Sequence, residues 1–165
     1  MRKFGGDRVI KSDVLHVEGG NPRATIVADL TCANDLPSNT LDCIICTQAL
    51  SFIYDVRTAI QALHRILKPH GVLLATSHGI SQISRNDMDR WGEYWRFTTL
   101  SARRLFEEVF PSDHVTVEAY GNVLAAVSFL HGLAAEELTK EELDHIDPDY
   151  EVLITVRAVK ARAIL

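Results

Sequence analysis

The chain has 165 residues, enough for one domain with a single core and too few for two independent domains. Hydrophobic residues make up 47% and charged residues 24%, which excludes disordered, collagen-like and disulfide-scaffold proteins. The net charge of -5 removes the attraction to phosphate backbones on which nucleic-acid binding depends. We therefore expect one folded domain over residues 1–165 that binds neither DNA nor RNA.

The N-terminal residues 1–8 carry charge and lack the apolar core of a secretion signal, and no apolar run is long enough for a membrane span. The 3 cysteines fit a reducing compartment. We expect a cytoplasmic protein without membrane attachment. Cys43 and Cys46 form a C-x-x-C pattern, but a strand would point the two thiols to opposite faces, and no histidine pair accompanies them. No metal site or redox pair is predicted.

Along the chain, apolar residues alternate between strand-like and helix-like patterns, which indicates an α/β fold. Parallel strands are predicted, in chain order, over residues 8–12, 24–28, 42–47 and 72–76. A helix over residues 55–67 lies between the last two strands, and Pro69 ends it. These elements form a strand-helix-strand unit.

The second half of the chain continues the alternation. A helix over 101–110 precedes a strand over 115–120, and Asn122 caps an apolar helix over 123–133. Thr139 begins a short helix, and residues 150–160 form a final strand that is predicted to run antiparallel to its neighbour.

Several motifs occur in a characteristic order. They are Val27-Ala28-Asp29-Leu30, Leu36-Pro37, the apolar run 41–46, and His64-Arg65-Ile66-Leu67-Lys68-Pro69-His70-Gly71 before the next strand. Together they resemble class I S-adenosylmethionine-dependent methyltransferases of the type 11 kind. Two differences are that Leu41 replaces the usual phenylalanine and His70 replaces the first glycine of the turn. The resemblance implies a Rossmann-like, mostly parallel sheet with helices on both faces.

One feature of the family is missing from the sequence. These enzymes begin with a strand and a glycine-rich loop that approaches the cofactor closely. Gly5-Gly6 follows no strand, and Gly19-Gly20 leaves no room for a helix before the strand at 24, so both are predicted to be turns. By resemblance the chain begins at the family's second strand and is N-terminally truncated; whether Met1 is the true start stays open.

The missing first strand is central in the family's sheet, between the second and the fourth. Without it, a sheet edge and an apolar face are left open. We expect a homo-oligomer that forms through the exposed sheet edge. The alternative is a monomer in which strand 8–12 pairs directly with strand 42–47.

The resemblance also implies cofactor contacts at the carboxyl ends of the strands. Asp13 would accept hydrogen bonds from the ribose hydroxyls and Asp29 from the adenine amino group of S-adenosyl-L-methionine. Leu30 would cover the adenine, and Thr47 and Gln48 would face the cofactor or the acceptor. The alternative is that both aspartates are local caps and Gln48 is a solvated loop residue.

The long segment 77–99 lies over the acceptor pocket in the family, and here it contains Trp91, Tyr94, Trp95 and Arg96. Aromatic rings beside guanidinium groups suit a flat or anionic acceptor, such as a sugar or a nucleotide-linked sugar. The alternative is that Trp91 and Trp95, four residues apart, form a packed helical turn.

His78, at the end of a predicted strand, is the candidate catalytic base for a hydroxyl acceptor. Two functions are therefore open. The first is a methyltransferase that acts on a small molecule, such as a sugar or glycan precursor, and binds its cofactor weakly. The alternative is a catalytically inactive methyltransferase remnant that serves as an interaction module.

Overall fold

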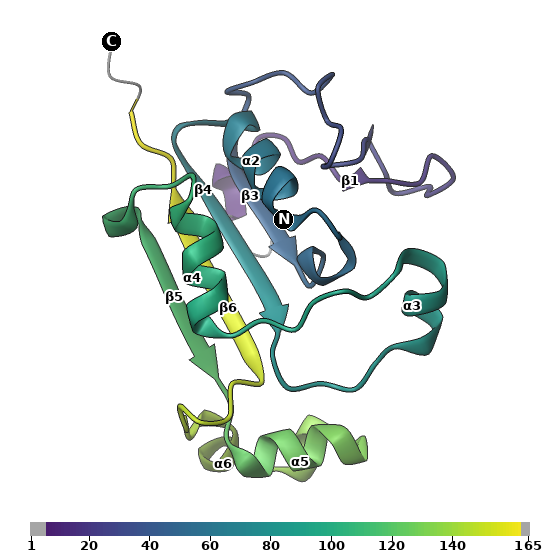
Figure 1. Ribbon diagram of the computed structural model, residues 1–165, viewed down its shortest axis with the longest axis vertical. Helices are drawn as coiled ribbons and strands as arrows, with labels where there is room; N and C mark the ends of the chain where they lie inside the picture. The colour runs from purple at the N-terminus through teal and green to yellow at the C-terminus, as the bar shows by residue number, and fades with distance from the viewer. Residues whose placement is uncertain (1–5, 163–165) are drawn as a thin grey trace.

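The computed structural model describes residues 6–162 and contains two separate sheets (Figure 1). The main sheet has the strand order β3-β4-β6-β5, formed by β3 (Leu41–Thr47), β4 (Leu67–His78), β5 (Val115–Tyr120) and β6 (Leu153–Val159). The second sheet pairs β1 (Leu15–His16) with β2 (Ile26–Val27) in parallel. No strand pairing joins the two sheets within the described part of the chain.

The strand directions agree with the sequence-based prediction. β3 and β4 are parallel, with Ile44 opposite Leu73 and Thr47 opposite Thr76. β6 lies between β4 and β5 and runs antiparallel to both. The mostly parallel α/β fold with a reversed last strand is therefore confirmed, and the carboxyl ends of β3 and β4 lie at the same edge of the sheet.

The described residues contain five α-helices, which are α2 (Val56–Ile66), α3 (Arg85–Trp91), α4 (Thr99–Glu107), α5 (Val123–His131) and α6 (Lys140–Asp144). Four short 3-10 helices cover Gly6–Arg8, Leu50–Phe52, Ser112–His114 and Ala135–Glu137. The predicted caps at Asn122 and Thr139 are confirmed, because each side chain accepts a hydrogen bond from the backbone N–H three residues later.

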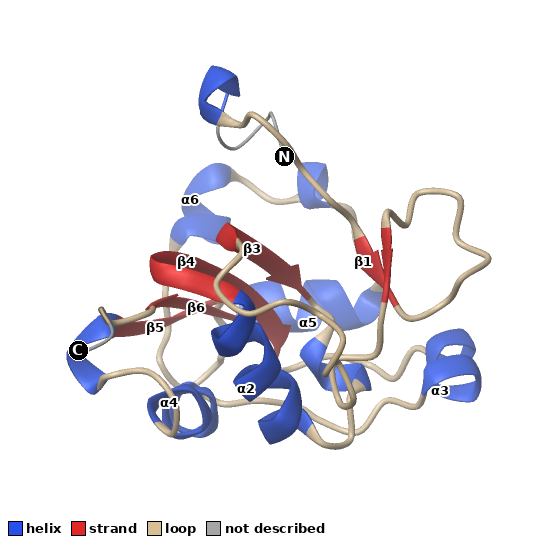
Figure 2. Cartoon of the chain, turned by 90° about the horizontal axis from the view of Figure 1, so that it is seen from above, coloured by secondary structure: helices blue, strands red, loops and turns tan. Residues whose placement is uncertain are grey.

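Helices α2 and α4 pack on the same face of the main sheet (Figures 1 and 2). The core between them and the sheet contains Ile60, Phe106 and Ile154, each almost completely buried. The strand residues that face the other way are more open, and Leu74 is 38% exposed.

The predicted strand over residues 8–12 is wrong. Residues 9–14 are irregular, and pairing starts at Val14, whose carbonyl accepts from the N–H groups of Thr25 and Ile26. Residues 8–12 have no neighbouring strand to satisfy their backbone groups, so they do not form one. Asp13 consequently precedes β1 instead of following a strand. The alternative pairing of this segment with β3 is also wrong.

The end of α2 is tied to the C-terminal strand. The Lys160 ammonium donates to the backbone carbonyls of His64 and Leu67, at 2.9 and 2.8 Å, and to the Asn39 side-chain carbonyl at 2.9 Å. These carbonyls lie at the negative end of the helix dipole, where a cation is favourable. His70 takes the left-handed conformation of the family's glycine, with a φ of 63°, and its N–H donates to the Lys160 carbonyl.

Candidate functional site

The carboxyl ends of β3 and β4 bring Gln48 and His78 together. Gln48 directly follows β3 and has a φ of 56°, an uncommon value for a residue with a side chain. Its N–H donates to the Thr76 carbonyl at 2.8 Å, which fixes the backbone there. The Gln48 Oε1 lies 3.0 Å from Nδ1 of His78, the last residue of β4. Both residues were predicted from sequence to lie at this edge.

The loop that follows β4 adds two charged side chains to this pair. Arg96 places one guanidinium nitrogen 3.1 Å from Nε2 of His78 and another 2.8 Å from the Glu93 carboxylate. The Glu93 side chain is only 3% exposed, and its second oxygen accepts from the Ser84 N–H at 3.0 Å. Gln48, His78, Glu93 and Arg96 thus form a connected polar cluster, called here the His78 network.

Its hydrogen bonds determine the tautomer of His78. Arginine can only donate, so Nε2 accepts from Arg96 and Nδ1–H donates to Gln48. Burial and the Arg96 charge lower the pKa of His78, while Glu93 opposes the shift. The imidazole is therefore neutral at pH 7, and Nε2 becomes available to accept a proton when Arg96 is displaced.

Sequence reasoning did not identify Glu93. The sole signal was an acidic residue three positions before Arg96 in a loop rich in aromatic residues. Whether its carboxylate would be buried depends on the path of residues 79–98, which no local pattern determines.

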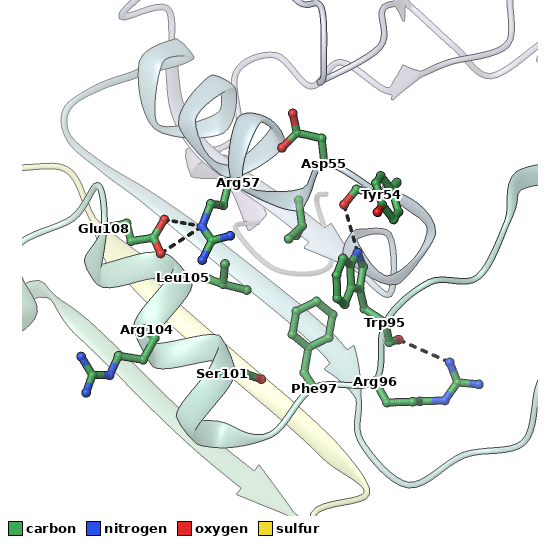
Figure 3. Close-up of a pocket in the computed structure, with 11 residues that line it drawn as sticks. Tyr54, Asp55, Arg57, Trp95, Arg96, Phe97, Ser101, Arg104, Leu105 and Glu108 are labelled. Atoms are coloured by element: carbon green, nitrogen blue, oxygen red, sulfur yellow. Dashed lines mark hydrogen bonds and ion pairs between the residues drawn. The ribbon is translucent and has the colours of Figure 1, made fainter.

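A cavity of about 440 Å³ lies between the start of α2 and helix α4 (Figure 3). Trp95 and Phe97 form one wall, while the Arg96 side chain between them points away. The Trp95 ring stacks on Tyr54 at a centroid distance of 6.1 Å, and its N–H donates to the Ile53 carbonyl at 3.0 Å. The volume is in the range of small-molecule sites.

The polar wall of this cavity is an ion pair between two helices. Arg57 on α2 contacts Glu108, at the end of α4, at 2.9 Å. The Arg57 guanidinium therefore already has an anionic partner, and both side chains are well exposed.

The remaining aromatic residues of the loop do not gather at one place. Trp91 ends α3 and meets His16 of β1 edge-on at 5.8 Å, whereas Trp95 stacks on Tyr54. Gly92, with a φ of 80°, terminates the helix between them, so the alternative of a packed turn containing both tryptophans is wrong. Tyr94 is half exposed and meets Tyr54 edge-on at 5.3 Å.

The predicted adenosine contacts Asp13 and Asp29 lie next to the small sheet, not at the edge of the main sheet that carries Gln48 and His78. Asp29 follows β2 and is exposed; its Oδ1 accepts from the N–H and the hydroxyl of Thr31, both at 2.8 Å. Asp13 contacts Lys11 and the Thr25 hydroxyl, each at 3.1 Å, and the hydrogen bond from Lys11 lowers its pKa.

The two other predicted contacts differ in exposure. Leu30 is buried in the hydrophobic core, whereas Thr47 at the end of β3 is exposed.

The cysteines behave as the strand pattern predicts. Cys43 is exposed and Cys46 is buried, so the thiols lie on opposite faces of β3 and both are free. Burial raises the pKa of Cys46 to about 11.

Residues 6–162 contain no group of side chains that could hold a metal ion. In the same range, no helix has the length and hydrophobicity needed to cross a membrane.

Residues 9–75 match the methyltransferase domain family, which is less than half of the chain. No curated protein sequence matches the chain. Among solved structures, a SAM-dependent methyltransferase from Archaeoglobus fulgidus aligns with a TM-score of 0.61 at 12% identity, covering 96% of this chain and 80% of that one. The chain has a class I methyltransferase fold. The resemblance inferred from its sequence motifs is thereby confirmed.

Two further structures show the same methyltransferase fold. Phosphoethanolamine N-methyltransferase 2 from Haemonchus contortus, in complex with phosphomonomethylethanolamine and S-adenosylhomocysteine, aligns with a TM-score of 0.52 at 15% identity over 82% of this chain. The [4+2]-cyclase SpnF aligns with a TM-score of 0.51 at 17% identity over 84%. The methyltransferase-like chain spans 37% of the first protein and 57% of the second.

The family match divides the candidate residues into two groups. It includes Asp13, Asp29 and Gln48, but it ends at residue 75. His78 and the loop residues of this methyltransferase-like chain lie beyond it, so their roles are inferred from geometry alone.

Proposed function

We propose that the protein is an S-adenosylmethionine-dependent methyltransferase that acts on a small-molecule acceptor. The observation that carries the proposal is the His78 network at the carboxyl ends of β3 and β4, the edge where open α/β sheets bind ligands. The imidazole does not line the cavity, but Arg96 joins it to the loop that forms the aromatic wall, and a neutral imidazole suits the deprotonation that methyl transfer to a hydroxyl requires.

The carboxylates of Asp13 and Asp29 are the proposed contacts of the adenosine half of the cofactor. Both bonds to Asp29 use Oδ1, which leaves the acceptor positions of Oδ2 for the adenine amino group. Asp13 remains the proposed partner for the ribose hydroxyls, although it precedes β1 and its carboxylate contacts Lys11 and the Thr25 hydroxyl. Thr47 and Gln48 complete the proposed contacts, whereas Leu30 stays in the core. When bound, the cofactor supplies an electrophilic methyl group.

The acceptor is proposed to bind in the cavity beside Trp95. The stacked Tyr54 and Trp95 rings form an aromatic wall that suits a sugar ring or a nucleotide-linked sugar, so a glycan precursor is the proposed substrate class. Phe52, in the same β3–α2 loop as Tyr54, meets His78 edge-on at 6.4 Å. One loop therefore connects the cavity with the proposed base.

Calorimetry with S-adenosylhomocysteine tests the cofactor assignment. Binding is expected to be weak, and Asp29→Ala should weaken it by about 10- to 100-fold because a charge-assisted acceptor is lost. Asp35→Ala, which removes another exposed carboxylate six residues away, is the matched control. Tight binding that Asp29→Ala leaves unchanged contradicts the assignment.

One observation favours a catalytically inactive interaction module instead. Asp13 and Oδ1 of Asp29 are engaged by local partners, and Nε2 of His78 is occupied by Arg96. The same calorimetry separates the two functions, because a module without cofactor binding gives no heat with S-adenosylhomocysteine at any concentration.

We also propose that the outer edge of β3 pairs with a second copy of the chain. β3 is hydrogen-bonded to β4 on one side only, and edge strands of this kind readily recruit another strand. The proposed location is the cytoplasm, since Cys32 and Cys43 are exposed free thiols.

A further inference from the structure

Helix α5 has its large apolar residues on the outside. Val127 is 47% exposed and Leu130 is 52% exposed, whereas the inward positions Ala126 and Ser128 are each 4% exposed. A helix on the surface of a globular protein normally shows the reverse arrangement. The small residues let α5 approach the rest of the protein, and the large ones remain free to contact something else.

Four of the exposed apolar residues form one continuous stripe. Val123, Leu124, Val127 and Leu130 are spaced so that they share one side of the helix, and all are exposed. We call this stripe the α5 face. A contiguous apolar stripe indicates an interaction site, in contrast to single apolar residues scattered on a surface.

The helix is held firmly in this orientation. The Asn122 side chain, which is buried, caps α5 through the Ala125 N–H and donates to the carbonyls of Glu142 and His145 at 2.8 Å each. These bonds fix α6 and the residues after it beside the start of α5, at the end of the main sheet (Figure 1). The apolar face is therefore a defined surface.

The segment attached to α5 is strongly acidic. Residues 136–149 contain seven carboxylates and one lysine, the carboxylates being Glu136, Glu137, Glu141, Glu142, Asp144, Asp147 and Asp149. The lysine, Lys140, pairs with Asp144, so it adds no free positive charge. The apolar face consequently lies beside a region of negative potential.

We infer that the α5 face is the docking site for a protein partner that presents an amphipathic helix, apolar on one side and bordered by lysine and arginine. The apolar stripe would supply the buried contact, and the carboxylates would attract the basic border. A second copy is disfavoured because it would bring two acidic segments together in a chain whose net charge is already -5. An anionic membrane is disfavoured by the same repulsion.

The experiment uses the full chain and a fluorescein-labelled helical peptide with leucines along one side and lysines along the flanks. A twin peptide with glutamate in place of every lysine tests the charge requirement. Fluorescence anisotropy should show binding of the basic peptide only, weakened at least tenfold between 50 and 500 mM salt, because the Debye length falls from about 14 to about 4 Å over that range. Leu130→Ser and Val127→Ser should each weaken binding about tenfold or more.

Val27→Ser is the matched control, because Val27 is 56% exposed on β2, in the separate small sheet. Circular dichroism of each variant checks that the fold is retained. Equal binding of the two peptides overturns the charge requirement, and binding insensitive to Leu130→Ser overturns the site. If the chain self-associates and Leu130→Ser abolishes that association, the occupant of the α5 face is a second copy and the proposed partner is wrong. If the chain binds phosphatidylserine vesicles and Leu130→Ser abolishes that binding, the occupant is a membrane and the proposed partner is wrong.

Discussion

Two charged neighbours of the His78 imidazole have opposite effects on its protonation. Arg96 disfavours its protonation and Glu93 favours it, while burial adds to the effect of Arg96. Because Arg96 is held by Glu93 and by the Gln82 carbonyl at 2.9 Å, it is a positioned cation and not a freely moving one. The protonation of His78 is therefore linked to the position of the loop that carries Arg96.

This linkage predicts a pH-dependent stability. The pKa of His78 is lower in the fold than in the unfolded chain. The contribution of His78 to the free energy of unfolding is therefore complete above about pH 6.5 and is lost as the pH falls through the folded pKa. Between pH 7.5 and 5.5, urea unfolding should show a larger fall in the free energy of unfolding for the natural chain than for His78→Gln. Burial also lowers the pKa of His64, so His78→Gln should keep part of the pH dependence.

A second prediction concerns Glu93. Glu93→Gln removes the carboxylate that opposes the shift, so the pKa of His78 should fall further, and Arg96 should lose its buried partner. The NMR titration of the His78 ring proton measures the first effect. A pKa of His78 that does not change would contradict the network, and Glu107→Gln, which alters a surface pair with Arg103, is the control.

Some of the site could be predicted from residue types and their places on strands. Gln48 and His78 end neighbouring parallel strands, so a sheet rule alone brings them together. Glu93 and the separation of Trp91 from Trp95 depend on the folding of a loop in which Gly92 interrupts a helix. Spacing in the sequence does not reveal that kind of interruption in advance.

At the level of elements, the bond between Lys160 and the end of α2 has a measurable effect. Lys160→Met keeps the side-chain length but leaves the carbonyls of His64 and Leu67 without their donor. We expect the free energy of unfolding to fall by about 1–2 kcal/mol. Denaturant melts measure it, and Lys68→Met, which removes an exposed pair with Asp42, should cost about 0–1 kcal/mol. Equal losses in the two variants would contradict the capping role.

The elements that sequence patterns predicted best are helices whose first residues are marked by a capping side chain. Asn122 and Thr139 each cap a helix at the expected place, because a cap is a local hydrogen bond. The strand predicted over 8–12 failed for the opposite reason. A strand needs a neighbour, and no periodicity in the chain could show that this neighbour was lacking.

At the level of the whole molecule, the open edge of β3 predicts concentration-dependent association. Light scattering should give a mass near 18.4 kDa on dilution and a larger mass at high concentration. Cys43→Lys, an exposed position on β3, should shift the protein to the smaller mass because lysine discourages edge pairing. Thr116→Lys places the same charge on β5, the opposite edge, and should have no effect. A monomer at every concentration would contradict the proposal.

Helix α3 connects the small sheet with the rest of the protein. Arg90 contacts Glu18 at 2.8 Å and Trp91 meets His16 edge-on, but the ion pair is exposed and each strand of the small sheet has only two residues. We therefore expect stability to be distributed unevenly along the chain. Leu30, next to Asp29, is anchored in the hydrophobic core, whereas the segment around Asp13 is held mainly by exposed contacts, and segments of that kind open locally at lower free energy than a packed sheet. A ligand held by both carboxylates would restrict this local opening as it binds.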